Sequence, residues 1–386
     1  MKKLILPVLL LLLVSFELKS QDTEPDSLDE YHQFLFSLID EVNVGMYDNF
    51  VEAVDFGAIA DFAIADLNVP DFEKQEFRRG LVDGASREFA ENMFEGAGLV
   101  EYINYFEEEG DYFMLVRIFG EGGLNYINFQ VNKNEAGELK IIDFYPYMSG
   151  EYISTTLNRT AKMFFSQSSF FEAIIENLIG SEKEVVQNLP VLMKIGNLIA
   201  NQAFEDARRE YDALPEAAKN DKLFILTMIQ AATMLDDQYY LALLDRYEEN
   251  YADDPSYPLV MLDSYLLRGR IEESLVLVDQ LDEAVGGDNF LNYLRGNVAM
   301  IGEDTTAAIK YYELAVENDL YFEEPYWELA GLEVELGNYE QAVKYLGRLN
   351  FVFGYFFSEE DFDPEVDKEF IESKAFKDWV ETQEQY

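Results

Sequence analysis

The 386-residue chain contains no cysteine and a single histidine, His32. Without cysteine it can form no disulfide, no thiolate nucleophile and no lipid anchor on an N-terminal cysteine. A serine–histidine–aspartate triad could be built only around His32. This residue lies in an amphipathic helical pattern, where a histidine at the edge or surface of the helix is more common than a catalytic one. Zinc sites usually need cysteine or several histidines. We therefore expect a non-enzymatic protein with no catalytic residue, no cofactor and no metal.

Positive charge is also scarce, because 28 lysine and arginine residues face 76 aspartates and glutamates. The resulting formal net charge of -48 repels nucleic acid and anionic membrane surfaces. The electrostatically favoured partners are cations, basic peptides and basic proteins, although an acidic surface can also serve solubility alone. We expect no nucleic-acid partner.

The N-terminus has one apolar run, residues 4–14, and it is too short to cross a bilayer. Two lysines precede this run and Ser20 follows it, which is the pattern of a secretory signal peptide over residues 1–20. An uncleaved anchor stays open as the alternative, since Leu18 occupies a position where signal peptidase favours a small residue. After cleavage we expect an exported, periplasmic or extracellular protein that is soluble, is not a lipoprotein and has no integral membrane segment.

Small and apolar residues recur in the C-terminal half at a constant spacing. Ser274, Ala308 and Ala342 stand at equal intervals, and a small residue suits a site where two helices cross closely. Two further positions share the interval: Val278, Tyr312 and Leu346, and Leu281, Ala315 and Leu349. The interval is that of the tetratricopeptide two-helix unit, whose period is about 34 residues.

The clearest unit spans residues 326–346, YWELAGLEVELGNYEQAVKYL, and resembles a tetratricopeptide repeat with its inter-helix turn at Gly337 and Asn338. Upstream copies are marked by Gly302, Gly269, Ala242 and Ala207, the last two at spacings of 32 and 35 that depart from the period. The resemblance implies about five units within an all-α solenoid over residues 181–350.

In that family the first helices of stacked units line a concave groove that binds extended peptides. By register, the resemblance places these residues in the groove: Asp263, Tyr293, Asn297, Met300, Trp327 and Glu335. Some members of the family hold the terminal carboxylate of a peptide with a set of basic and asparagine side chains. Of the six residues here, only Asn297 is of a type found in that set. The acidic and aromatic character of the set favours a basic or aromatic protein or peptide instead. Alternatively, Trp327 and Tyr293 pack between neighbouring repeats.

The preceding region, residues 21–180, has the pattern of an α+β domain. Amphipathic helices are expected over 28–42 and 72–94, the second with Asp71 as its cap. Strands are expected over 99–106, 112–119, 124–131 and 139–147. Short turns between them predict a four-stranded antiparallel sheet, with the helices covering one face. Residues 351–386 should cap the far end of the solenoid.

Two other sites are open on the sequence. An apolar pocket beneath the sheet could be lined by Tyr126, Phe129, Phe144 and Tyr147, although strand aromatics are more often core residues. Acidic residues near the C-terminus loosely resemble a calcium loop: Asp361, Asp363, Glu365, Asp367, Glu369 and Glu372. Val366 stands where such a loop needs glycine, so a solvated linker is the alternative there.

These observations favour an exported scaffold or protein-interaction protein of the cell envelope, which binds a peptide or protein through the acidic and aromatic groove. The alternative is a small-ligand-binding protein or an enzyme whose site lies in the N-terminal α+β domain.

Overall fold

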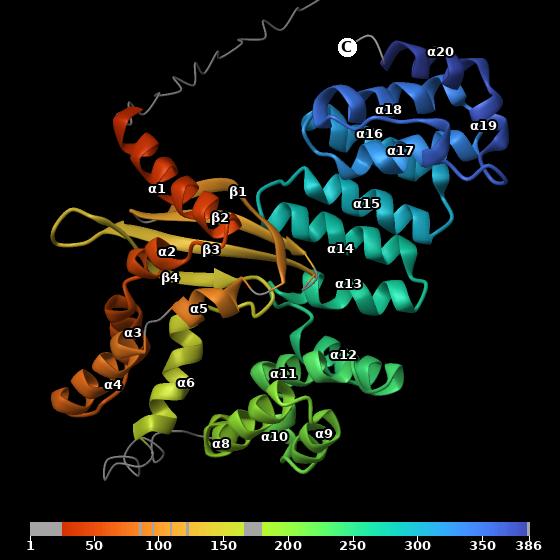
Figure 1. Ribbon diagram of the computed structural model, residues 1–386. Coiled ribbons are helices and arrows are strands. Elements are labelled where there is room, and N and C mark those ends of the chain that lie inside the picture. The colour runs from red at the N-terminus through yellow and green to blue at the C-terminus, as the bar shows by residue number, and fades with distance from the viewer. Residues whose placement is uncertain are drawn as a thin grey trace, which may run out of the picture.

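The computed structural model describes residues 25–84, 87–94, 96–108, 110–120, 123–165 and 180–383. The expected signal peptide, residues 1–20, lies outside these ranges. The described part of the chain begins with helices, continues through an antiparallel sheet and ends in a long helical array (Figure 1). The expected α+β region followed by a helical region is therefore confirmed.

From residue 25 onward, the described residues form five helices before the sheet: α1 (Pro25–Asn43), α2 (Asp48–Ala53), α3 (Phe56–Ile64), α4 (Asp71–Asp83) and α5 (Arg87–Met93). The pattern predicted one helix over 72–94, and this was wrong, because α4 ends at Gly84, whose backbone N–H bonds to the carbonyl of Gly80. Glycine disfavours a continuous helix through its backbone entropy. Asp71 is the first residue of α4, and Pro70 takes the capping position that we had expected Asp71 to fill.

The sheet has the order β1-β2-β3-β4, with each strand antiparallel to its neighbour. The strands are β1 (Ala97–Glu108), β2 (Asp111–Gly120), β3 (Gly123–Lys133) and β4 (Leu139–Pro146). In this register Arg117 of β2 stands opposite Glu101 of β1 and Tyr126 of β3. This strand order confirms the predicted meander. The strands form here because aromatic and β-branched residues suit a pleated surface that is buried on both sides.

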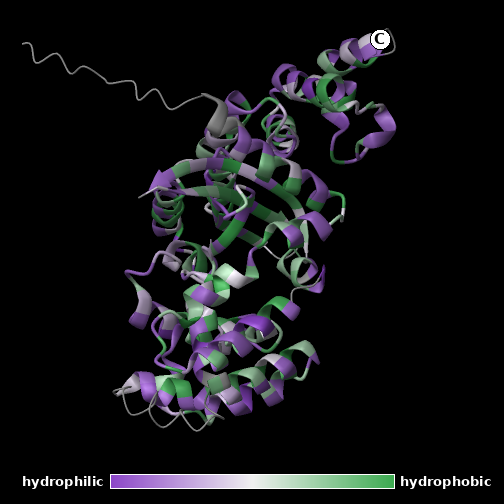
Figure 2. Ribbon diagram, turned by 90° about the vertical axis from the view of Figure 1, so that its left-hand side faces the viewer, coloured by the Kyte–Doolittle hydropathy of each residue, from purple (hydrophilic) through white to green (hydrophobic). Residues whose placement is uncertain are grey.

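One face of the sheet is covered by the N-terminal helices. Met114, Phe129 and Ile141 point into this layer, where they pack with Leu35 of α1 and Phe50 of α2. In Figure 2 the strands form a largely hydrophobic centre, whereas the helices around them alternate between hydrophobic and hydrophilic residues. This face is the core of the α+β region.

The opposite face of the sheet packs against the helical array. Leu115, Tyr126 and Tyr147 belong to the same buried cluster as Met261 and Leu281 of the array. Alternate residues of a strand point to opposite faces, so Met114 and Leu115 serve the two layers in turn. The sheet is therefore shared between two cores.

After β4, helix α6 (Ile153–Phe165) precedes the array. The array's helices pack as consecutive pairs, with the short α10 (Glu216–Lys219) between the first two pairs. The pairs are α8 (Ser181–Ala200) with α9 (Phe204–Asp212), α11 (Lys222–Ala232) with α12 (Asp237–Tyr251), α13 (Tyr257–Leu267) with α14 (Ile271–Ala284), α15 (Phe290–Ile301) with α16 (Thr305–Asn318), and α17 (Glu324–Glu335) with α18 (Tyr339–Phe353).

The 34-residue spacing corresponds to real packing positions. Ser274, Ala308 and Ala342 are each fully buried on the second helix of a pair. The turns inside three pairs place Gly269, Glu303 and Gly337, which share this spacing, in the left-handed region. The turn that we assigned to Gly302 therefore has its left-handed residue one position later, at Glu303.

The chain ends in α19 (Lys368–Glu372) and α20 (Lys374–Gln383) after a 3-10 turn, Glu359–Asp361. Phe370, Phe376 and Trp379 pack with α18, so this segment covers the last hydrophobic face of the array. Over the described residues, no helix is both long enough and apolar enough to cross a membrane.

Candidate functional site: a pocket between the sheet and the array

The loops between successive helix pairs lie along the edge of the array that faces the α+β region. Asp254 and Asp288 occupy loops 252–256 and 285–289, again at the 34-residue spacing. The α+β region reaches the same edge through side chains that bond to main-chain carbonyl groups. Asn104 Nδ2 donates to the carbonyl of Val285 at 2.9 Å, and Tyr147 Oη donates to that of Ala284 at 3.0 Å. These loops are the places where the two parts of the chain are joined.

Asp288 is buried, and its carboxylate accepts hydrogen bonds from side chains of the sheet. Arg117 Nη1 donates to both carboxylate oxygens, at 2.6 and 2.7 Å, and Tyr126 Oη donates to one of them at 2.7 Å. The backbone N–H of Phe290 supplies a further bond at 3.0 Å. Burial and the Asp288 charge raise the pKa of Tyr126 well above its usual value, so its hydroxyl stays a donor. A buried charge needs this degree of pairing.

Asp254 makes the equivalent junction one helix pair earlier. Lys222 Nζ donates to its carboxylate at 2.8 Å and to the carbonyl of Gly150 at 3.0 Å. Ser256 donates to the same carboxylate from its backbone N–H and its hydroxyl. Burial acts to raise the pKa of Asp254, but the bonds from Lys222 and Ser256 together outweigh it and hold that pKa below its usual value. Gly150 has a left-handed φ of 61°, and a Cβ there would crowd Ser256.

A third junction acid lies at the start of α11. Asp221 stands 3.6 Å from Arg159 of α6, and its side chain caps α11 by accepting from the N–H of Leu223. Burial raises the pKa of Asp221, and Arg159 only partly offsets that effect. Each of these three acids is therefore matched by a basic side chain at the junction.

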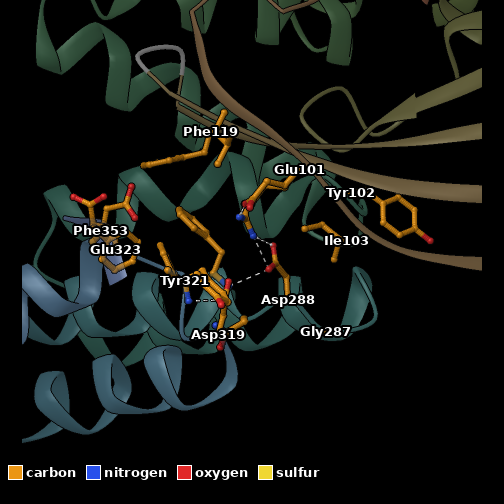
Figure 3. Close-up of a pocket in the computed structure, with 16 residues that line it drawn as sticks. Glu101, Tyr102, Ile103, Phe119, Gly287, Asp288, Asp319, Tyr321, Glu323 and Phe353 are labelled. Carbon is orange, nitrogen blue, oxygen red and sulfur yellow. Dashed lines mark hydrogen bonds and ion pairs between the residues drawn. The ribbon is translucent and has the colours of Figure 1, made fainter. Parts of the chain in front are cut away.

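The fourth loop, 319–323, departs from this pattern because the sheet does not close over it. Between β1 and β2 on one side and the loops 287–290 and 319–324 on the other lies an open pocket of about 500 Å³, which we call the junction pocket. In Figure 3, Phe119 and Glu101 extend from the strands, whereas Asp288, Asp319 and Tyr321 extend from the array below. The ring of Tyr102 points away from this space.

The walls of the junction pocket are aromatic. Phe119 and Phe290 lie with ring centroids 4.7 Å apart, and Phe290 and Phe322 follow at 5.9 Å. Cζ of Arg117 stands 4.5 Å from the centroid of Phe290, so one guanidinium already lies on an aromatic ring in this pocket. That guanidinium is also paired with Glu101 and Asp288.

The rim of the junction pocket is acidic. Asp319, Glu323 and Glu324 line it from the fourth loop and the first turn of α17. Among the described residues none of these three carboxylates has a lysine or arginine within ion-pair distance. Asp319 instead accepts the backbone N–H of Tyr321 at 2.8 Å. The pocket thus combines aromatic walls with carboxylates that carry uncompensated charge.

Exposed aromatic side chains continue outward from this rim. Trp327 Nε1 donates to Glu323 at 2.9 Å, and the Trp327 ring packs edge-on against Tyr355 at 5.1 Å. The hydrogen bond to Glu323, with a contribution from burial, raises the pKa of Tyr355. Tyr321 is 79% exposed. We call the set Asp319, Tyr321, Glu323, Glu324, Trp327 and Tyr355 the acidic-aromatic surface.

The residues assigned to a groove by register have different surroundings. Tyr293 is half-buried between Phe290 and Tyr312 of its own helix pair and Phe322 of the following loop. Trp327 is 38% exposed and also packs on the C-terminal segment through Tyr355. The sequence therefore marked two residues that adjoin the junction pocket.

The other four assigned residues are spread along the array. Asn297 accepts a bond from Tyr312 Oη at 2.7 Å, and Asp263 accepts one from Tyr240 Oη at 2.7 Å. Met300 is half-buried against the core of the last repeats, and Glu335 is exposed at the end of α17. Asp263 lies on α13 and Glu335 on α17, two helix pairs apart.

The aromatic strand residues considered for a ligand pocket are mostly packed. Tyr126 and Tyr147 are buried against the array, and Phe129 is buried under the N-terminal helices. Phe144 does line a separate apolar hollow of about 220 Å³, together with Phe56, Ile59, Leu81, Phe89 and Leu157. The neighbouring Asp143 is buried and bonded by Ser154, and burial raises its pKa.

The two remaining chemical candidates have structural partners. His32 lies edge-on against the rings of Tyr102 and Tyr105, at 5.4 and 4.6 Å. In the acidic C-terminal segment, Asp363 accepts the backbone N–H groups of Glu365 and Val366, and Asp367 accepts that of Asp363. Within the described chain no group of three acidic or histidine side chains could hold a metal ion. Asp363 and Asp367 therefore bind the backbone of their own turn, whereas Glu369 accepts a bond from Tyr339 Oη.

Sequence reasoning missed the junction acids and the pocket. One signal was present, because Asp254 and Asp288 share the 34-residue spacing already seen at Ser274, Ala308 and Ala342. A polar residue that recurs at the period of a hydrophobic repeat indicates that the fold requires a polar side chain at that position. The partners of Asp288, Arg117 and Tyr126, are 171 and 162 residues away in the chain and have no such signal.

No protein family and no curated protein matches this chain. The assignment of function therefore depends on the geometry of the junction pocket and of the acidic-aromatic surface next to it.

Proposed function

We propose that this protein is an exported, non-enzymatic docking protein that binds a basic segment of a partner protein on its acidic-aromatic surface. The observation that carries the proposal is the rim of the junction pocket. Three carboxylates there lack a cationic partner in the described structure, and exposed aromatic rings surround them. Large aromatic side chains and uncompensated charge are typical of sites where proteins bind each other.

We further propose that the helical array is a tetratricopeptide-type solenoid. The support is the pairing of its helices, the buried small residues at a 34-residue spacing, and the left-handed turn residues at the same spacing. Solenoids of this kind present extended surfaces to partner proteins. The docking surface proposed here lies at the inter-repeat edge and near the cap, rather than along one concave groove.

The compartment belongs to the same proposal. Residues 1–20 have the pattern of a cleaved signal peptide, and the absence of cysteine suits a protein that is not lipid-anchored. We propose a periplasmic or extracellular location, where the net charge of -48 would favour a basic partner over nucleic acid.

A second candidate function is supported by the hollow lined by Phe144. Its volume of about 220 Å³ and its apolar lining would suit a short alkyl or small aromatic ligand. None of the described residues that line it is charged, so we propose a binding site rather than a catalytic one.

Site-directed photo-crosslinking in the source cells tests the docking function. A photoreactive amino acid is placed at Tyr321, on the acidic-aromatic surface, and separately at Met193, which is exposed on α8. We expect one protein to be crosslinked from position 321 and not from position 193. The adduct should diminish when cells are lysed in high salt before illumination, because screening weakens contacts between exposed charges.

The same set of crosslinked proteins at both positions would contradict the proposal, since it would indicate collision with abundant proteins. A salt-resistant adduct at 321 would contradict its electrostatic part. Co-purification of an apolar small molecule, lost on Leu157→Trp, would favour the second candidate, because Leu157 lines that hollow.

A further inference from the structure

We infer that the junction pocket receives an arginine side chain of the partner protein, held between Phe322 and the rim carboxylates. The inference rests on the proposed docking function and specifies the chemistry of its contact.

The loops between helix pairs form a series with one unfilled member. Asp221 is matched by Arg159, Asp254 by Lys222, and Asp288 by Arg117, and each of these cations lies at the boundary with the α+β region. The fourth loop carries Asp319, three residues before the position that the 34-residue spacing makes equivalent to Asp288, and no cation is in place beside it among the described residues. An arginine from another protein would complete the series where this chain's own sheet ends.

The aromatic walls indicate what kind of cation fits. Arg117 shows the arrangement within the same pocket, with its guanidinium on the ring of Phe290 and its nitrogens on carboxylates. Phe322 lies next to Phe290 in a nearly parallel orientation, with ring planes 25° apart, and both rings line the pocket. A planar guanidinium stacks on such a ring and still presents its N–H groups sideways to carboxylates, which a lysine ammonium cannot do.

The charge and size of the pocket agree with this occupant. Among the described residues, five carboxylates line it, from Glu101, Asp288, Asp319, Glu323 and Glu324, against one guanidinium, that of Arg117. Arg117 is engaged by Glu101 and Asp288, which leaves the three rim carboxylates for an incoming cation. A volume of about 500 Å³ is large enough for one arginine side chain with part of its backbone.

A direct binding experiment uses residues 21–386 of the protein, without the expected signal peptide, and a fluorescein-labelled peptide of four Gly-Arg repeats. Two matched peptides replace arginine by lysine or by citrulline, which is the uncharged isostere of arginine. Fluorescence anisotropy at 0.15 M salt gives the affinities. We expect the arginine peptide to bind at least fivefold more tightly than the lysine peptide, and the citrulline peptide not to bind.

The variant Asp319→Asn/Glu324→Gln removes two rim charges, whereas Asp253→Asn/Glu340→Gln removes two exposed charges outside the pocket. We expect the first variant to lose at least tenfold in affinity for the arginine peptide and the second less than threefold. Phe322→Leu, which keeps an apolar side chain, should reduce the preference for arginine over lysine. Circular dichroism checks that each variant is folded.

Equal losses in the two charge variants would overturn the inference, because binding would then follow the general negative field. Equal affinity for arginine and lysine peptides would overturn the stacking arrangement. The docking function is tested apart from both. If the Asp319→Asn/Glu324→Gln variant still gives the adduct from position 321, the pocket inference fails while docking stands; absence of the adduct in the otherwise wild-type protein contradicts both.

Discussion

At the scale of single residues, the junction acids show how the same residue type takes opposite pKa shifts in neighbouring loops. The pKa of Asp254 lies below its usual value because Lys222 and Ser256 donate to its carboxylate and outweigh the effect of burial. The pKa of Asp221 lies above its usual value because burial dominates over Arg159. The number and quality of donors, rather than burial alone, decide the direction.

The pH dependence of stability follows from these directions. Because the folded-state pKa of Asp254 is lower than that of the unfolded chain, its carboxylate contributes stability above the unfolded value, about 3.9. This contribution is lost as the pH falls through the folded-state pKa. Asp221 acts in the opposite sense, since its raised pKa contributes stability at low pH that is lost as the pH rises through that pKa.

We predict that Asp254→Asn lowers the free energy of unfolding at pH 7 by about 3 kcal/mol, because it leaves Lys222 buried without its counter-charge. The difference from wild type should begin to shrink as the pH falls below about 4, where the carboxylate of the unfolded chain takes up a proton, and should be lost once the pH is below the folded-state pKa. Urea unfolding followed by circular dichroism at pH 7 and near pH 3 measures both effects.

The adjacent, exposed Asp253 offers the matched control. Asp253→Asn makes the same chemical change in the same loop and should alter the free energy of unfolding by less than about 0.5 kcal/mol. Equal effects of the two substitutions would show that the loss comes from the net charge of the loop and not from the Lys222 pair.

At the scale of helices, two glycines of the array have opposite roles. Gly296 lies on α15 where it faces α16, and a Cβ added there would overlap the ring of Tyr312. Gly331 lies on the exposed side of α17, and a Cβ added there would meet no atom within 4 Å. The first glycine permits two helices to approach each other, whereas the second merely weakens its helix.

The same substitution should therefore change stability in opposite directions. We predict that Gly296→Ala lowers the free energy of unfolding by about 2 kcal/mol, because Tyr312 must move within a packed interface. Gly331→Ala should raise it by about 1 kcal/mol through helix propensity. Urea denaturation of the two variants, side by side with wild type, makes the comparison. A loss of stability in both would indicate that Gly331 has a packing role in the fold.

At the scale of the whole molecule, the sheet belongs to two hydrophobic cores at once. Met114 is fully buried under the N-terminal helices, and its neighbour Leu115 is buried against the array. The contacts of Asp288 and Asp254 join the same two parts by polar bonds. Burial on both sides of a four-stranded sheet makes independent unfolding of either part costly, because it would expose one apolar face of the sheet.

We predict that the sheet and the adjoining helix pair unfold together. Met114→Ala, on the face away from the array, should lower the free energy of global opening by about 3 kcal/mol through the cavity that it leaves. Native-state hydrogen exchange should show the same decrease for the slowest amides of β2 and of α13 and α14. A decrease confined to the sheet and the N-terminal helices would show that the array is stable on its own.

The sequence predicted the pattern of elements better than their limits. Alternating aromatic and β-branched residues located all four strands, and the short turns between them gave their order, because both are local properties. The helix over 72–94 was wrong at Gly84, since periodicity alone does not register a break at one residue. The six groove residues had been placed by register alone, and their neighbours show that Tyr293 and Asn297 are bound within the array.

By itself the sequence determined the local structure of this protein and its chemical character. Residue periodicity located the strands and the 34-residue helix pairs, and composition determined the acidic charge and the lack of cysteine. Only the tertiary structure decided which face of the sheet meets the array, and thereby where a pocket remains open. That choice depends on contacts such as Arg117 with Asp288, 171 residues apart, whose pairing follows from shape and burial and not from any local pattern.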